Sequence, residues 1–190
     1  MDGEMFINYR GEDSHSYGAL LYVDLSLRFG PERVFLDSES IPAGADFTAE
    51  LLSRVRRASV LLAVLGPQWL AVTDASGTPR IADPADWIRR ELAAAFALGT
   101  RVIPVLTDGA RLPSENELPA DLGQLARCQY RRLRHRDAIV DLGRIASDLA
   151  TADPSLASAM AGDGRCRRCH ESRHRPVALP ATGRRLRRSG

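Results

Sequence analysis

Short apolar runs alternate with longer amphipathic stretches along the first 150 residues of the chain. The short runs are rich in Val, Ile and Leu, which is typical of strands buried on both faces of a sheet. Four of them are Met5–Tyr9, Val34–Leu36, Val60–Leu65 and Val102–Leu106, and a fifth strand is expected near Cys128–Leu133. Apolar residues at helical spacing predict helices over Tyr17–Phe29, Phe47–Arg57, Trp87–Leu98 and Asp137–Leu149.

This order of elements predicts an α/β fold. A helix between two strands returns the chain so that the next strand runs in the same direction, which makes the sheet parallel and places helices on both of its faces. Gly30 and Gly99 mark the predicted ends of two helices, and Asp83 before Pro84 is expected to cap the helix that follows. The polar segment 107–123 is predicted to be a loop with at most a short helix.

The composition separates the chain into two parts. With 44% hydrophobic and 26% charged residues in 190, it fits an ordinary globular protein. Beyond about Met160, nine arginines stand against two acidic residues and aliphatic runs nearly vanish. We therefore predict one domain over residues 1–152 and a basic, Arg-rich, low-complexity tail over residues 153–190 that is disordered. Such tails are usually solvated, so nucleic-acid binding is not expected.

The N-terminal residues and the cysteines favour a cytoplasmic protein. No charged and apolar leader begins the sequence, and no apolar run approaches the length that spans a membrane, so we expect no membrane contact. Cys128, Cys166 and Cys169 are expected to be thiols in a reducing compartment. Cys166, Cys169, His170 and His174 offer zinc-ligand types, although His170 directly after Cys169 strains a four-ligand closure. We predict no metal site and leave zinc binding by this cluster open.

Candidate functional residues follow the ends of the predicted strands. Ligands of open parallel sheets bind at the carboxyl ends of the strands, where the connecting loops diverge. On the helix that follows the third strand, Trp87 and Glu91 are four residues apart and share one face. We therefore expect an indole and a carboxylate to face one crevice. The residues at the other strand ends are Tyr9, Arg10, Asp37 and the loop that reaches Gly44.

Several of these segments resemble the signatures of one family, the TIR (Toll/interleukin-1 receptor) domains. Phe6–Asp13 resembles the first TIR signature, and Val34–Asp37 with Ile41–Gly44 resembles its second strand and following loop. Trp87–Glu91 is similar to the Trp-x-x-x-Glu motif of TIR domains that cleave NAD+. The resemblance spans roughly residues 4–150 and implies a flavodoxin-like fold with a five-stranded parallel sheet.

The resemblance to NAD+-cleaving members also implies an activity. It implies an NAD+ nucleosidase that breaks the bond between nicotinamide and ribose, giving nicotinamide and ADP-ribose or a cyclic isomer, with Glu91 as the essential acid. Arg10 is expected to pair with a phosphate, and Phe47 or Trp87 to stack on a ring. The expected substrate-binding residues are Tyr9, Arg10, Asp37, Gly44, Phe47 and Trp87. NAD+ is the substrate, and no cofactor is implied.

One carboxylate is chemically sufficient for this reaction. Nicotinamide leaves as a neutral base, so the reaction needs no general acid, unlike ordinary glycoside hydrolysis. The carboxylate then has only to stabilise a ribosyl cation, by about 4 kcal/mol at an effective dielectric near 20.

The family implies two roles for such a domain. In signalling or antiphage defence, an enzymatic TIR domain self-associates, and a downstream effector senses its product. The alternative is a non-catalytic adaptor that binds other TIR domains through the loop around Ile41–Gly44 and through its helix surfaces.

Overall fold

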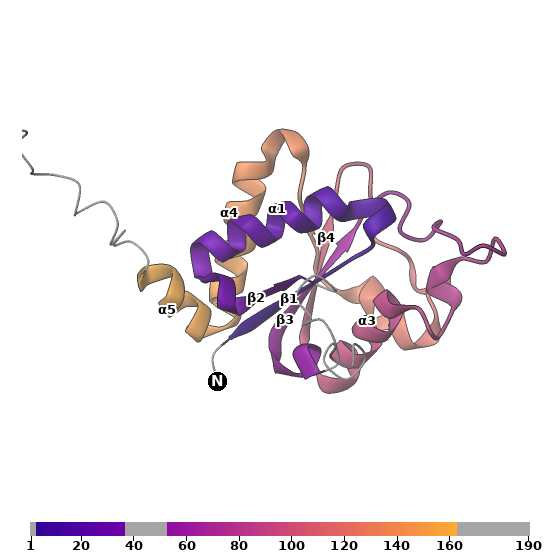
Figure 1. Cartoon of the computed structure of the whole chain (residues 1–190), viewed down its shortest axis with the longest axis horizontal. Helices are drawn as coiled ribbons and strands as arrows, with labels where there is room; N and C mark the ends of the chain where they lie inside the picture. Colours follow the sequence, from indigo (N-terminus) through magenta and orange to yellow (C-terminus); the bar gives the residue numbers. More distant parts are fainter. Residues whose placement is uncertain (1–2, 37–52, 163–190) are drawn as a thin grey trace, which may run out of the picture.

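The computed structural model describes residues 3–36 and 53–162 (Figure 1). Five strands form one sheet in the order β2-β1-β3-β4-β5, and every pairing is parallel. The predicted α/β class and five-stranded parallel sheet are therefore confirmed. After β1 the chain builds β2 on one side and β3 on the other, so the strand order reverses at β1. The strands are β1 Glu4–Tyr9, β2 Val34–Leu36, β3 Ala58–Leu65, β4 Arg101–Leu106 and β5 Arg131–Arg132.

Helices cover both faces of the sheet, as Figure 1 shows. On one face α1, α4 and α5 pack together, and on the other lies α3. Of the helix predicted over Phe47–Arg57, residues 53–57 are helical and the rest lies outside the described residues. The α-helices whose two ends both lie among the described residues are α1 Gly11–Phe29, α3 Trp87–Leu98, α4 Ala138–Ala152 and α5 Pro154–Gly162.

The alternation of side chains along β1 separates two apolar cores. Successive residues of a strand point to opposite faces. Met5 and Ile7 join the core under α1, α4 and α5, whereas Phe6 joins the core under α3. Asn8 therefore points toward α3. Because β1 is central and buried on both faces, this polar residue lies inside the protein, with 0% of its surface exposed.

The two glycines predicted to end helices do so, whereas α1 begins at Gly11, before the predicted start at Tyr17, and α4 continues to Ala152, past the predicted end at Leu149. Gly99 adopts the left-handed conformation (φ 73°) that ends α3, and Gly30 (φ 97°) ends α1. The predicted cap of α3 is wrong, because Asp86 and not Asp83 precedes its first turn and accepts a hydrogen bond from the Arg89 amide at 3.1 Å. Asp83 instead accepts from the Ala85 amide at 2.8 Å and forms the turn that leads into the cap.

The packed part of the chain extends past the expected boundary at residue 152. Pro154 opens α5, where its missing N–H is harmless in the first turn, and Asp153 accepts a hydrogen bond from the Ser155 amide. Leu156 is fully buried in the core under α1 and α4. Residues 163–190, with the Cys166, Cys169, His170 and His174 cluster, lie outside the described residues.

The connection between β4 and β5 is more ordered than expected. It contains two 3-10 helices, η4 Glu115–Glu117 and η5 Ala120–Arg127, where a loop with at most a short helix was predicted. Leu122 and Leu125 of η5 are buried against α3, which explains why this segment is held in place. In residues 3–36 and 53–162, no helix has both the length and the apolar character needed to cross a membrane.

Candidate active site

Glu91 occupies a position in α3 where the helical pattern calls for an apolar residue. The buried residues of α3 recur at intervals of three and four and form the stripe that faces the sheet. Glu91 lies in the middle of this stripe with 0% of its surface exposed. The stripe consists of Ile88, Glu91, Leu92 and Ala95. The α3 core is thus apolar around a carboxyl group.

Asn8 of β1 meets this carboxyl group across the interface between helix and sheet. Its Nδ2 donates to Glu91 Oε2 at 2.6 Å and lies 3.4 Å from the Ile88 carbonyl oxygen. Sequence reasoning did not select Asn8. The signal that points to it is an amide in a strand whose other residues, from Met5 to Tyr9, are apolar or aromatic.

A buried ion pair fixes the start of α3 to the end of β1. Arg10 Nη1 and Nη2 donate to Asp86 Oδ2 and Oδ1, each at 3.0 Å, and both side chains are almost fully buried. Asp86 is also the N-cap of α3. The geometry is the bidentate fork that guanidinium and carboxylate favour. Arg10 thereby anchors the helix that carries Glu91.

Further ionic contacts extend from this pair to the surface. Arg80 Nε lies 3.4 Å from Asp86 Oδ2, and Arg80 Nη1 donates to Glu12 Oε1 at 2.6 Å. The acids next to Arg10 in the sequence do not pair with it, because Asp86, 76 residues away, binds the guanidinium. Asp13 instead accepts a hydrogen bond from the Gln68 backbone amide at 2.8 Å.

The other predicted site residues are distributed over both faces of the sheet. Trp87 is half-buried beside the α3 core, and the guanidinium carbon of Arg90 lies 4.4 Å from its ring centroid. Tyr9 belongs to the opposite core, with its ring 5.8 Å from that of His15. The structure therefore places Glu91, Trp87 and Arg10 around α3 and turns Tyr9 toward α1. Asp37, Gly44 and Phe47 lie outside the described residues.

Trp69, which follows β3, is a packing residue. It is 2% exposed and belongs to the α3 core. Its neighbours line a hollow of about 370 Å³ at the carboxyl ends of β3 and β4. Among the described residues that line this hollow are Gly66, Leu70, Gly109 and Arg111. It lies at the edge of the sheet where α/β proteins bind ligands.

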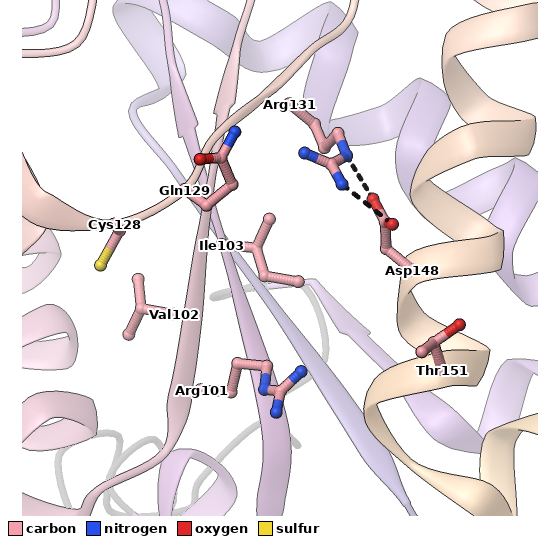
Figure 2. Close-up of a pocket in the computed structure, with 8 residues that line it drawn as sticks. All are labelled: Arg101, Val102, Ile103, Cys128, Gln129, Arg131, Asp148 and Thr151. Atoms are coloured by element: carbon pink, nitrogen blue, oxygen red, sulfur yellow. Dashed lines mark hydrogen bonds and ion pairs between the residues drawn. The ribbon is translucent and has the colours of Figure 1, made fainter.

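A second hollow, of about 380 Å³, lies at the outer edge of β4 (Figure 2). Its walls are β4, the segment before β5 and α4, and Figure 2 shows Arg131 of β5 paired with Asp148 of α4 across it. Burial raises the pKa of the Cys128 thiol at its rim, which keeps this thiol protonated at neutral pH. Glu91 lines neither this hollow nor the one beside Trp69 in the described part of the chain.

Another buried acid, Asp141, serves as a reference for Glu91. Arg134 donates to it through Nε and Nη2 at 3.0 Å and through its backbone amide at 3.1 Å. The side-chain hydrogen bonds from Arg134 are the main cause that holds the pKa of Asp141 below its ordinary value, and the hydrogen bond from the backbone amide of Arg134 adds to them. Across residues 3–36 and 53–162, no group of three or more His, Cys, Asp and Glu side chains is arranged to hold a metal ion.

Comparison with known proteins agrees with the fold and the sequence signatures. The family model described as a TIR domain matches residues 5–145. The NAD(+) hydrolase sarm1 of Drosophila melanogaster is 31% identical over 125 residues, which are 65% of this chain and 8% of that protein. The chain therefore spans only a small part of that relative's length.

A solved structure shares the fold. The TIR domain of the activated Roq1 resistosome that recognises the effector XopQ superposes with a TM-score of 0.58 at 15% identity. The superposition covers 77% of this chain and 99% of that one. Since the family match extends over most of the chain and the sheet has the corresponding architecture, this chain belongs to the TIR domain family.

Proposed function

We propose that this TIR domain hydrolyses NAD+ at the bond between nicotinamide and ribose, with Glu91 as the essential acid. The observation that carries the proposal is the burial of Glu91 in the sheet-facing stripe of α3, beside the carboxyl end of β1. Strand order reverses at β1, which is where α/β sheets bind ligands. The relative from Drosophila melanogaster, named an NAD(+) hydrolase, supports the same chemistry.

Folding alone gives little reason for a glutamate at this position. Moving a carboxylate out of water is unfavourable even when it is hydrogen-bonded, and an apolar residue of similar size would suit the stripe of α3 better. Departures of this kind from local sequence rules concentrate at functional sites. The identity of residue 91 is thus better explained by chemistry than by stability.

The reaction follows from the charges of the substrate. As the glycosidic bond breaks, its electron pair leaves with nicotinamide, the positive charge moves from the pyridinium to the ribose, and the Glu91 carboxylate stabilises this cation. At about 4 Å and an effective dielectric near 20 the attraction is about 4 kcal/mol, worth roughly a thousandfold in rate. Water then adds to the ribose carbon, which gives ADP-ribose and releases one proton.

The remaining substrate contacts are part of the proposal. Trp87 offers a half-buried indole on the same helix for stacking on a ring. The pairing of Arg10 with Asp86 supports an anchoring role for Arg10 more than the phosphate contact expected from the sequence. The proposed contacts of Asp37, Gly44 and Phe47 fall outside the described residues.

Access to Glu91 connects turnover to assembly. Because Glu91 is fully buried in the single chain, ribose reaches its carboxylate only after neighbouring side chains move apart. Contact with a second TIR domain supplies free energy for such a change. We therefore expect turnover per chain to rise with protein concentration.

The test is nicotinamide release from NAD+ by the purified full chain, measured when it is dilute and when it is concentrated or crowded. We expect release by the native chain at high concentration, and a loss of about a thousandfold or more in Glu91→Gln. Glu32→Gln makes the same chemical change at an exposed position and should retain full activity. If no condition yields release from the native chain, the enzyme proposal fails and the adaptor function remains.

A further inference from the structure

The contact between Asn8 and Glu91 defines how the side-chain amide of Asn8 is oriented. The two groups on α3 that approach Asn8 Nδ2 are Glu91 Oε2 and the Ile88 carbonyl oxygen, and both accept hydrogen bonds. The amide nitrogen, and not its oxygen, must therefore face the helix. This fixes the orientation of the Asn8 side chain without ambiguity.

The surroundings hold Asn8 in this orientation. It is fully buried in the central strand β1 and pairs in register with Ala63 of β3, whose small side chain lies on the same face. Arg10, two residues further along the chain, is clamped to Asp86 directly before α3. The donor on β1 is thus held by the sheet, and the helix that carries the acceptor is held by the separate contact between Arg10 and Asp86.

A neutral donor at this place has a defined effect on a carboxylate. A hydrogen bond donated to a carboxylate favours its ionised form. The bond from Asn8 also fixes the position of Oε2 of Glu91 and thereby the direction of the carboxylate. A cation in the same place would neutralise the charge that the proposed reaction uses. An amide orients the carboxylate and leaves its negative charge intact.

From this geometry we infer that Asn8 is a positioning residue for Glu91, one that fixes the direction of its carboxylate and maintains its ionised form for the chemistry. The inference rests on the proposed NAD+ hydrolysis. Asn8 acts through Glu91 and does not itself touch the reacting atoms.

The test compares Asn8→Leu, Asn8→Asp and a matched control in the full chain, at a concentration where the native chain is active. In Asn8→Leu, kcat should fall about 10- to 100-fold with KM nearly unchanged, since a hydrogen bond to a charged group is lost. The acidic limb of the kcat–pH profile should move to higher pH. Asn8→Asp should move it further, because two touching carboxylates do not both ionise.

The control is Thr107→Val, a substitution of similar shape at a residue that is 1% exposed and donates to the Leu65 carbonyl oxygen at 3.3 Å. It removes a buried hydrogen bond from the same sheet without changing the contact to Glu91. We expect its pH profile to match that of the native chain. Equal shifts in Asn8→Leu and Thr107→Val, or no shift in either, would overturn the positioning role. If Asn8→Leu does not fold, Asn8→Asp provides the same comparison.

A second measurement separates this inference from the proposed function. The carboxyl carbon of Glu91 is titrated by NMR in the native chain and in Asn8→Leu, with its signal assigned by its loss in Glu91→Gln. A higher midpoint in Asn8→Leu supports the Asn8 contact, and equal midpoints refute it. An inactive native chain with a shifted midpoint would refute the hydrolase while leaving the Asn8 contact to Glu91 established.

Discussion

Helices α3 and α4 lie on opposite faces of the same sheet, and each carries one acid in its sheet-facing stripe (Figure 1). In α4 the acid is Asp141, in the first turn, where a helix N-terminus favours negative charge. It accepts three hydrogen bonds from Arg134. In α3 the acid is Glu91, the fifth residue of the helix and thus one position further in than Asp141 in α4, and it accepts a hydrogen bond from the neutral amide of Asn8.

The difference between these acids separates a structural charge from a candidate catalytic one. Asp141 has a guanidinium, a backbone amide and a favourable helix end, so folding alone accounts for it. Glu91 interrupts an apolar stripe beside the carboxyl end of β1, where folding would favour a hydrocarbon. Burial alone therefore does not mark an acid as functional, and the position of Glu91 in an apolar stripe beside the end of a central strand carries more weight.

The largest expected effect on stability concerns the ion pair between Arg10 and Asp86, which fixes the start of α3 to the end of β1. Arg10→Ala should lower the free energy of unfolding by up to about 3–5 kcal/mol, because the buried Asp86 carboxylate loses its bidentate partner and keeps only the longer contact with Arg80. Asp86→Ala should cost a similar amount and should also remove the α3 cap. Urea denaturation of the two single variants and of the double variant Arg10→Ala with Asp86→Ala measures the coupling between the two side chains. A stability loss below about 1 kcal/mol in Arg10→Ala, together with a raised KM for NAD+, would restore the phosphate-binding role.

The next prediction concerns the opposite core, to which α4 belongs. Leu156 of α5 is fully buried there, so Leu156→Ala should cost about 2–4 kcal/mol by removing methyl groups and leaving a cavity. Leu98→Ala, at an exposed position near the end of α3, is a control that should cost far less. Both are measured by thermal or urea unfolding. Equal and small effects would mean that the domain ends before α5, as the composition suggested.

The smallest expected effect tests the structural acid itself. Asp141→Asn should cost about 1–3 kcal/mol at neutral pH, the usual value of hydrogen bonds to a charged group. Because Arg134 lowers the pKa of Asp141 in the folded state, this contribution is present above the unfolded pKa near 3.9 and is lost as the pH falls through the folded value. The stability difference between native and variant chains should therefore shrink below about pH 4. A difference that is constant from pH 7 to pH 3 would contradict the ionic explanation.

The sequence predicted those features that depend on local periodicity. The four apolar runs coincide with β1 to β4, and the predicted helix Trp87–Leu98 matches α3 at both ends. The single acid at position 91 was identified through its spacing from Trp87. These features succeed because repeats of two and 3.6 residues reflect which side of an element is buried.

Features that depend on distant contacts or marginal propensity were missed. The partner of Arg10 is 76 residues away, so nothing near Arg10 in the sequence indicates Asp86. β5 lies within the range expected for the fifth strand, but its two-residue length could not be predicted. η5 is a 3-10 helix held by packing against α3 and is too irregular for a periodic signal. The composition suggested that the domain ends at residue 152, but α5 follows and its Leu156 packs into the core.

The most direct test of the account pairs Glu91→Gln with Asp141→Asn and measures, for each variant, the unfolding free energy and the rate of nicotinamide release from NAD+. We predict that the two substitutions have opposite effects on stability and on turnover. Glu91→Gln should remain as stable as the native chain, or become more stable, while losing turnover, and Asp141→Asn should lose stability while keeping the turnover of its folded fraction. A Glu91→Gln chain that still releases nicotinamide at the native rate would contradict the assignment of Glu91 as the acid.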